Sequence, residues 1–146
     1  MYCICKNNLV KRMKTVMIFG TFDSVHDGHR ALFAQAVEHG DWVMAVVARD
    51  ETVERVKGRA PECDESDRIA ELLQISVLDD IIMGSLNEDK CNVVREHKPD
   101  VVMIGYDQEH FIDELYALAN ESDQDFVIVR AQAYEPSVYK SSLLNR

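Results

Sequence analysis

Two histidines, His26 and His29, lie in a ten-residue string suited to phosphate chemistry. The string Gly20-Thr21-Phe22-Asp23-Ser24-Val25-His26-Asp27-Gly28-His29 directly follows a short apolar run. Histidines three residues apart share one face if a helix begins near them. Free N–H groups at a helix start, with its positive dipole end, favour phosphate, and Gly28 lets a ligand approach the backbone closely. The imidazoles could then donate hydrogen bonds to the oxygens of a phosphorus under attack.

The spacing alone leaves two other interpretations of the pair open. An exposed histidine is usually a plain surface residue, and His-x-x-His can hold zinc, although no clear third ligand accompanies this pair. The common nucleotide signatures, G-x-x-x-x-G-K-[ST] and G-x-G-x-x-G, are absent from the chain. Phosphate binding is therefore a hypothesis that the spacing permits but does not decide.

Two later segments also carry residue types that suit an anionic substrate. Lys57-Gly58-Arg59 is a cationic, flexible loop into which a phosphate could enter. Gly105-Tyr106-Asp107-Gln108 follows an apolar run, and its carboxylate and amide could bind a ribose or a base. On residue types alone a solvated turn is the better interpretation of the first segment. A turn that caps the next helix is an equal interpretation of the second.

Five short apolar, β-branched runs must position these residues. They lack the alternation of a half-exposed strand, which indicates strands covered on both faces. They are Val16 to Phe19, Val43 to Ala48, Ile81 to Met83, Val101 to Ile104 and Phe126 to Val129. Segments with helical spacing lie between them, around Leu32 to Val37, Ile69 to Leu73, Val93 to His97 and Phe111 to Ala119.

This alternation predicts one α/β domain, with a Rossmann-like, doubly wound, five-stranded parallel sheet. Parallel neighbours need a crossover, and helices therefore cover both faces. Gly20 and Gly105 follow the first and fourth strands at the carboxyl ends, where such sheets bind ligands. Residues 1–12 show no periodicity and precede Met13. We expect a loose N-terminal extension there and the domain over residues 13–146.

Composition limits the classes of function. The chain has 146 residues and a net charge of −10, so its long-range field disfavours nucleic acids and acidic membranes. It has no apolar run near the roughly 18 residues of a membrane span, and no signal-peptide core at the N-terminus. The four cysteines form no CxxC pair, which indicates free thiols; they are Cys3, Cys5, Cys63 and Cys91. We expect a cytoplasmic protein.

The string from Gly20 to His29 resembles the G-T-F-D-x-x-H-x-G-H signature of the cytidylyltransferase-like nucleotidyltransferase superfamily, whose HxGH element is related to the HIGH element of class I tRNA synthetases. The chain is too short for a synthetase. Later blocks look most like the archaeal-type FAD synthetases, in order and spacing. They are Ala48-Arg49-Asp50, Lys57-Gly58-Arg59, Asp67-Arg68, Lys98-Pro99-Asp100, Gly105-Tyr106-Asp107-Gln108 and Tyr139-Lys140-Ser141-Ser142.

The resemblance implies a role for each matching residue. His26 and His29 would stabilise the α-phosphate during transfer, and Lys57 would contact a phosphate. The other matching positions would bind nucleotide or phosphate; they are Gly20, Thr21, Phe22, Asp23, Gly28, Arg68, Gly105, Tyr106, Asp107, Gln108, Arg130, Ser141 and Ser142. No residue is expected as a metal ligand, because Mg²⁺ would be held mostly by triphosphate oxygens and water.

The stretch after Arg130 departs from one branch of this superfamily. Glycerol-phosphate cytidylyltransferases typically carry Arg-Thr-x-Gly-Ile-Ser-Thr, whereas this chain inserts Ala131 to Lys140 before Ser141 and Ser142. The insertion argues against glycerol phosphate as acceptor. It also leaves a short closing helix.

The activity that the resemblance implies is transfer of a nucleoside monophosphate to a phosphorylated acceptor, with ATP and FMN favoured as substrates and FAD as product. A cytidylyltransferase acting on a small phosphorylated alcohol, such as glycerol 3-phosphate, stays open as an alternative. A nucleotide-binding module without catalysis is a third possibility, against which the intact His26 and His29 argue. The sequence does not decide between ATP and CTP, and relatives suggest a homodimer only by analogy.

A flavin would also need an apolar or aromatic wall for its ring. Five aromatic residues near the expected mouth could supply it, namely Phe22, Trp42, Tyr106, Tyr134 and Tyr139. Of these, Trp42 begins a strand and suits a core or an interface better.

Overall fold

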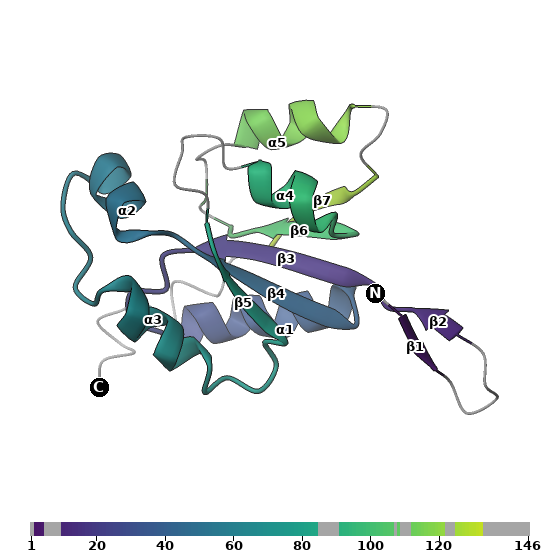
Figure 1. Ribbon diagram of the computed structural model, residues 1–146, viewed down its shortest axis with the longest axis horizontal. Helices are drawn as coiled ribbons and strands as arrows, with labels where there is room; N and C mark the ends of the chain where they lie inside the picture. Colours follow the sequence, from purple (N-terminus) through teal and green to yellow (C-terminus); the bar gives the residue numbers. More distant parts are fainter. Residues whose placement is uncertain are drawn as a thin grey trace.

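The five apolar runs form one parallel sheet at the centre of the computed structural model (Figure 1). Its strands are β3 (Thr15–Gly20), β4 (Trp42–Val47), β5 (Asp80–Met83), β6 (Val101–Ile104) and β7 (Val127–Arg130). Their order across the sheet is β5-β4-β3-β6-β7, and every neighbouring pair is parallel. Within this sheet the chain forms the central strand β3 first and then winds outward through β4 to the edge strand β5. It then returns to β6, beside β3, and ends at the other edge strand, β7. The predicted doubly wound α/β sheet is confirmed.

The structure describes residues 2–4, 10–84, 91–106, 108, 112–121 and 125–132, with side chains from Met13 onward. Asp107, Tyr134, Tyr139, Ser141 and Ser142 of the sequence predictions lie outside these ranges. Within the ranges, no helix is long and apolar enough to cross a membrane.

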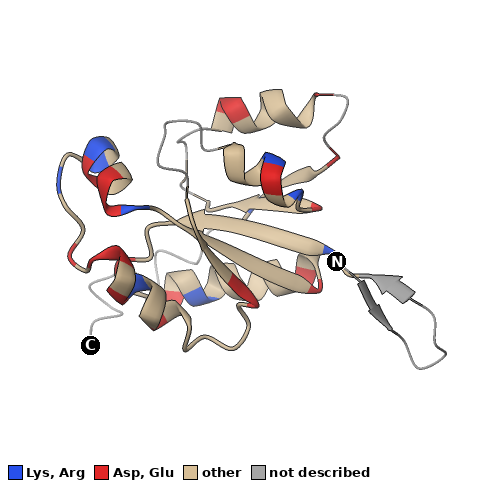
Figure 2. Ribbon diagram, in the orientation of Figure 1, with Lys and Arg blue, Asp and Glu red and all other residues tan. Residues whose placement is uncertain are grey.

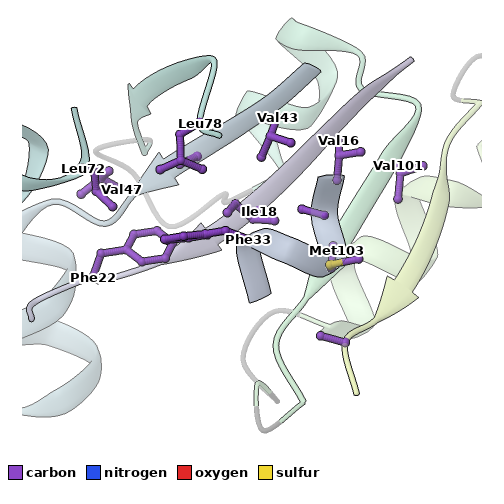
Figure 3. Packing of buried hydrophobic residues seen from close by; sticks show 13 residues of the cluster. Val16, Ile18, Phe22, Phe33, Val43, Val47, Leu72, Leu78, Val101 and Met103 are labelled. Atoms are coloured by element: carbon purple, nitrogen blue, oxygen red, sulfur yellow. The ribbon is translucent and has the colours of Figure 1, made fainter. Parts of the chain in front are cut away.

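Helices cover both faces of the sheet because successive strand residues point to opposite sides. On β3, Val16 and Ile18 pack in a cluster with residues of α1 (Asp27–His39) and α3 (Glu65–Leu72), shown in Figure 3. Met17 and Phe19 point the other way, into a cluster with residues of α4 (Asn92–His97) and α5 (Ile112–Ala119). The packing on both faces thus holds β3 in place, and it thereby fixes the position of the turn that follows this strand.

One helix, α2 (Asp50–Lys57), was not expected. We predicted a flexible loop around Lys57, and this is wrong because Lys57 ends the helix. Gly58 then ends it in the left-handed conformation, with φ 76°, and donates its N–H to the Glu54 carbonyl at 2.8 Å. Acidic residues in the first turn, basic residues in the last and a glycine directly after are the usual signals of such a helix.

The N-terminal segment contains two short strands, β1 (Tyr2–Ile4) and β2 (Val10–Arg12). They pair antiparallel in a sheet of their own, which projects from the domain in Figure 1. Main-chain hydrogen bonds hold such a ribbon, so it needs no apolar pattern in the sequence. Its looseness relative to the domain, and the domain boundary at Met13, stay predictions.

Candidate active site

The start of α1 holds His26 and His29 together, as their spacing predicted. His26 is the N-cap residue, and its Nδ1 accepts the Gly28 N–H at 3.0 Å. The Nδ1 of His29 accepts the His26 N–H at 3.2 Å. The two rings stack with centroids 4.0 Å apart and planes 23° from parallel.

These two bonds fix which nitrogen carries the proton in each neutral ring. A neutral imidazole has one N–H and one acceptor nitrogen. Because Nδ1 of His26 and of His29 accepts a backbone N–H, the ring proton of each neutral imidazole lies on Nε2. For His26, Nδ1 thus serves as the cap and Nε2 carries the ring N–H. The expectation of free N–H groups at this helix start is wrong for Gly28, whose N–H is bound to His26.

A zinc site at His26 and His29 would need a third ligand, and none is found among the described residues. Among the described residues, no group of three His, Cys, Asp or Glu side chains could hold a metal ion.

The turn between β3 and α1 is held by the ring of Phe22. This side chain is 2% exposed, its ring lies edge-on to His29 at 5.4 Å, and its ring centroid is 5.7 Å from that of Phe33 (Figure 3). Phe22 has φ 53°, a left-handed conformation unusual for a bulky residue. A Cβ on Gly20 would lie 2.8 Å from the Phe22 ring, so only glycine fits there. Phe22 is thus an anchor of the turn, and the hypothesis that its ring forms a flavin wall is wrong.

Asp23 joins this turn to the segment before α3. Its carboxylate accepts the N–H groups of Glu62 and Cys63, both at 2.8 Å. Burial opposes ionisation of Asp23, but the N–H donors of Cys63 and Glu62, helped by the charges of Arg68 and Lys57, outweigh it and lower the pKa. Asp23 is therefore an ionised structural tie, and no free acid or base.

Cys63 is a poor nucleophile. Burial, and then the charge of Asp23, raise the pKa of its thiol. A protonated thiol does not attack phosphorus. This fits a transfer without a covalent enzyme intermediate.

Arg68 lies beneath the site instead of in it. Its side chain is fully buried and donates to the Thr21 carbonyl at 2.6 Å, the Cys63 carbonyl at 3.2 Å and the Asp50 carboxylate at 2.7 Å. The structure thus assigns Arg68 partners within the protein, and its expected contact with a phosphate stays a prediction. No solvent-facing nitrogen remains to reach a ligand.

The carboxyl end of β6 forms the other side of the site. Gln108 accepts the Gly105 N–H at 2.6 Å with its side-chain oxygen and donates to the Phe19 carbonyl at 3.0 Å with its side-chain nitrogen. Both ends of the amide are thus engaged within the protein. The amide ties β6 to β3, and the hypothesis that Gln108 binds a ribose or a base stays a prediction.

Arg130, at the end of β7, supports the same turn and stays exposed. Its Nη1 donates to the carbonyls of Gly105, Tyr106 and Gln108 at 3.0 to 3.2 Å. The Tyr106 side chain is 45% exposed, so it remains available as a flavin wall. Trp42 begins β4, at the end of the strand away from the site, and packs against the α4–α5 layer, as its position suggested.

Basic residues gather at the end of α2 and just after it. Figure 2 shows these basic positions on a helix that also carries acidic positions, in a chain with net charge −10. Lys57 is exposed there, and its charge acts on Asp23 in the central turn. Lys57 therefore lies within electrostatic reach of the His26–His29 turn.

The sequence analysis missed one pair of residues that position the site. The Asp50 N–H donates to Glu65 at 3.0 Å, and the Glu65 N–H donates back to Asp50 at 3.2 Å. This exchange joins the starts of α2 and α3. The residues are 15 apart, and no local sequence signal indicates such a pairing.

Comparison with known proteins assigns the family. The Cytidylyltransferase-like family model matches residues 17–145. The chain belongs to the cytidylyltransferase-like family. Membership confirms the superfamily and the nucleotidyltransferase class that the GTFDxxHxGH string indicated.

Three relatives of this cytidylyltransferase-like protein carry the name FAD synthase. It is 35% identical to an FAD synthase of Thermoplasma volcanium over 92% of this chain and 93% of that one. An FAD synthase of Methanobrevibacter smithii is 35% identical over 89% and 86% of the two chains. An FAD synthase of Pyrococcus horikoshii is 37% identical over 68% of each. These matches confirm the resemblance to archaeal-type FAD synthetases.

Solved structures show the same fold. The crystal structure of a protein named lipopolysaccharide core biosynthesis protein, from Thermoplasma volcanium, has a TM-score of 0.77 and 36% identity, over 85% of this chain and all of that one. A pantoate-beta-alanine ligase of Francisella tularensis has a TM-score of 0.57 at 12% identity, over 89% and 64% of the chains. The second match supports the fold alone.

Proposed function

We propose that this protein is an FAD synthase, which transfers AMP from ATP to the phosphate of FMN and releases pyrophosphate. The observation that carries the proposal is the match to a named FAD synthase over nine-tenths of both chains. The His26–His29 pair supports it, because the two rings stack at the start of α1, just beyond the carboxyl end of β3, with the ring N–H of His26 on Nε2.

The reaction needs positioning and charge neutralisation more than a strong base. A phosphate oxygen of FMN attacks the α-phosphorus of ATP in line, and the bond from that phosphorus to the oxygen bridging the α- and β-phosphates breaks. The FMN phosphate is largely dianionic near neutral pH, so no proton must be removed first. Donors from His26 and His29 stabilise the charge on the α-phosphate oxygens in the transition state. Lys57 and Arg130 reduce repulsion between the two anionic substrates.

We also propose that Mg²⁺ enters with the triphosphate. Mg²⁺ keeps several waters and binds phosphate oxygens through octahedral geometry, and it would neutralise the leaving pyrophosphate. Transfer should be lost in EDTA and restored by excess Mg²⁺. Undiminished transfer in EDTA would contradict this.

A turnover assay with two triphosphates decides the function. The protein is incubated with Mg²⁺, FMN and either ATP or CTP, and the flavins are separated chromatographically; the His26→Asn variant is the control. FAD formed with ATP by the unmodified chain supports the proposal. Pyrophosphate release with CTP and glycerol 3-phosphate, without any flavin dinucleotide, would favour the cytidylyltransferase alternative. Binding of nucleotide without any turnover would favour the inactive module.

We also propose an oligomeric state and a cellular compartment. The family resemblance supports a homodimer, which light scattering at micromolar concentration would test. Free thiols at Cys63 and Cys91 support a reducing compartment such as the cytoplasm. Recovery of the protein in a membrane or secreted fraction would contradict the second property.

A further inference from the structure

Buried Arg68 controls the direction of one peptide group in the central turn. Its Nη1 donates to the Thr21 carbonyl at 2.6 Å, so this carbonyl points inward, toward the guanidinium. No cis peptide bond occurs in the described part of the chain, which includes Thr21 and Phe22, and in a trans peptide the C=O and N–H point in opposite directions. The Phe22 N–H of the same peptide therefore points away from Arg68.

This N–H has no backbone partner in the part of the chain that the structure describes, because no carbonyl there accepts it. Phe22 as a whole is only 2% exposed, so this N–H is a nearly buried donor without a backbone acceptor. The turn that carries it leaves the carboxyl end of β3 and leads directly to His26. An N–H at this place can donate to a phosphate oxygen, whereas the carbonyl in its place would repel one.

The peptide needs an external tie to keep this direction. Phe22 is held at φ 53°, which costs a bulky residue about 1–3 kcal/mol, and such conformations persist only where the surroundings impose them. The Phe22 ring is fixed by its packing beside Gly20, His29 and Phe33. Arg68 fixes the other side of the same peptide, through Thr21.

Arg68 is itself held in place. Asp50 accepts from its Nη2 at 2.7 Å, and Cys63 accepts from its Nε at 3.2 Å. Asp50 belongs to the first turn of α2, the helix that ends at Lys57. A single buried guanidinium thus ties the turn after β3 to the helix that carries Lys57.

We propose that Arg68 is a positioning residue for nucleotidyl transfer, which aims the Phe22 N–H at the triphosphate. The inference rests on the proposed function. Arg68 touches no substrate and acts through the Thr21–Phe22 peptide. Without it, that peptide is free to rotate, and a donor to the triphosphate is lost or replaced by a carbonyl.

Backbone NMR of the Phe22 amide tests the inference directly. The ¹⁵N-labelled protein is titrated with α,β-methylene-ATP and Mg²⁺, an inert analogue. The Phe22 amide of the unmodified chain should shift on titration. In Arg68→Met it should not respond, although other site amides still do.

Loss of one preorganised donor should reduce kcat about 10²-fold. Arg68→Lys, which can still donate to one carbonyl, should recover part of the loss.

Leu72→Ala is the matched control for plain destabilisation. Leu72 is fully buried one turn further along α3 and contacts no part of the turn through hydrogen bonds. This variant should melt lower and keep the kcat and KM of the unmodified chain while it is folded.

Two results would overturn the inference. One is an Arg68→Met protein that is folded and has unchanged kcat and KM. The other is an unmodified chain that binds the analogue while its Phe22 amide stays unshifted, a result that holds even if Arg68→Met does not fold. An unmodified chain that neither binds the analogue nor makes FAD would instead overturn the proposed function, and this inference with it.

Discussion

At the scale of single residues, His26 serves two functions through its two ring nitrogens. Nδ1 caps α1 by accepting the Gly28 N–H, and Nε2 is left as a donor. A neutral imidazole that accepts with Nδ1 carries its proton on Nε2. The tautomer that caps α1 is therefore also the one whose Nε2–H is suited to donate to a phosphate oxygen.

Replacing His26 by asparagine should separate these two functions. Asparagine is a good N-cap residue, so its side-chain oxygen can still accept the Gly28 N–H, whereas the Nε2 donor is lost. We expect kcat to fall by about 10²–10³ with a smaller change in KM, and the melting temperature to stay near that of the unmodified chain.

The contrast is His26→Ala, which loses both nitrogens. It should show the same loss of kcat and also about 1 kcal/mol of stability, measured by urea unfolding. Near-normal turnover in His26→Asn would refute the role of the Nε2 donor. An equal stability loss in both variants would refute the capping role.

Asp23 should make stability depend on acid pH. Its pKa is lowered by folding from its ordinary value of 3.8, so its contribution is present above that value and is lost as pH falls through the lowered pKa. Asp23→Asn should be less stable by roughly 1.5 kcal/mol at pH 7, because a charged acceptor of two N–H donors becomes neutral. The difference should shrink as the pH is lowered from about 5 toward 3. A constant difference in urea unfolding across this range would contradict it.

The sequence revealed the site residues whose partners are local. His26 and His29 bond to backbone groups within three residues, so their spacing alone suggested a helix start. The structural ties of Arg68 and Gln108 could not be predicted because these partners are distant, with Thr21 47 residues away and Phe19 89 residues away. A side chain buried by such contacts looks in the sequence like a free polar group.

At the scale of elements, the strands were predictable and one helix was not. Strands buried on both faces must be almost wholly apolar, and this holds for β3, β4 and β6. The edge strands β5 and β7 are only partly buried, with Val127 61% exposed, yet their apolar runs also matched strands of the sheet. The α2 helix has only two buried residues, Thr52 and Val53, so no apolar stripe identified it. Its signals were its charged ends and Gly58.

Gly58 should be needed for the end of α2. It adopts φ 76°, and a Cβ there would meet nothing within 4 Å, so the cost of a side chain is purely conformational. Gly58→Ala should lower stability by about 1 kcal/mol, because an L-residue is strained in this region. Gly58→Asn should cost less, since asparagine tolerates the left-handed region. Urea unfolding of both variants checks this, and an alanine variant as stable as the glycine chain would contradict it.

At the scale of the whole molecule, the net charge and the local charges act on an anionic substrate in opposite directions. A net charge of −10 repels an anionic substrate at a distance. If the protein binds ATP and FMN as we propose, their capture must depend on local donors, for which the candidates are the cations of α2, Arg130 and the N–H groups of the central turn. These groups come from separate elements, two of which, α2 and the central turn, are joined through the buried Arg68.

The N-terminal segment should be dispensable. Strands β1 and β2 pair only with each other in the described sheets, and the ribbon projects away from the five-stranded sheet (Figure 1). The domain's own hydrogen bonds begin at Lys14, whose N–H donates to Asp41 at 3.0 Å and whose carbonyl accepts from Asp41 and Trp42.

A chain that starts at Met13 keeps all of these bonds. It should melt within a degree or two of the full chain and transfer AMP at the same rate, because a projecting terminus contributes few buried contacts. Differential scanning calorimetry and the flavin assay measure both properties on the same samples. A markedly lower melting temperature would mean that the ribbon packs on the domain, and unchanged melting with lost activity would mean that it contributes to the site.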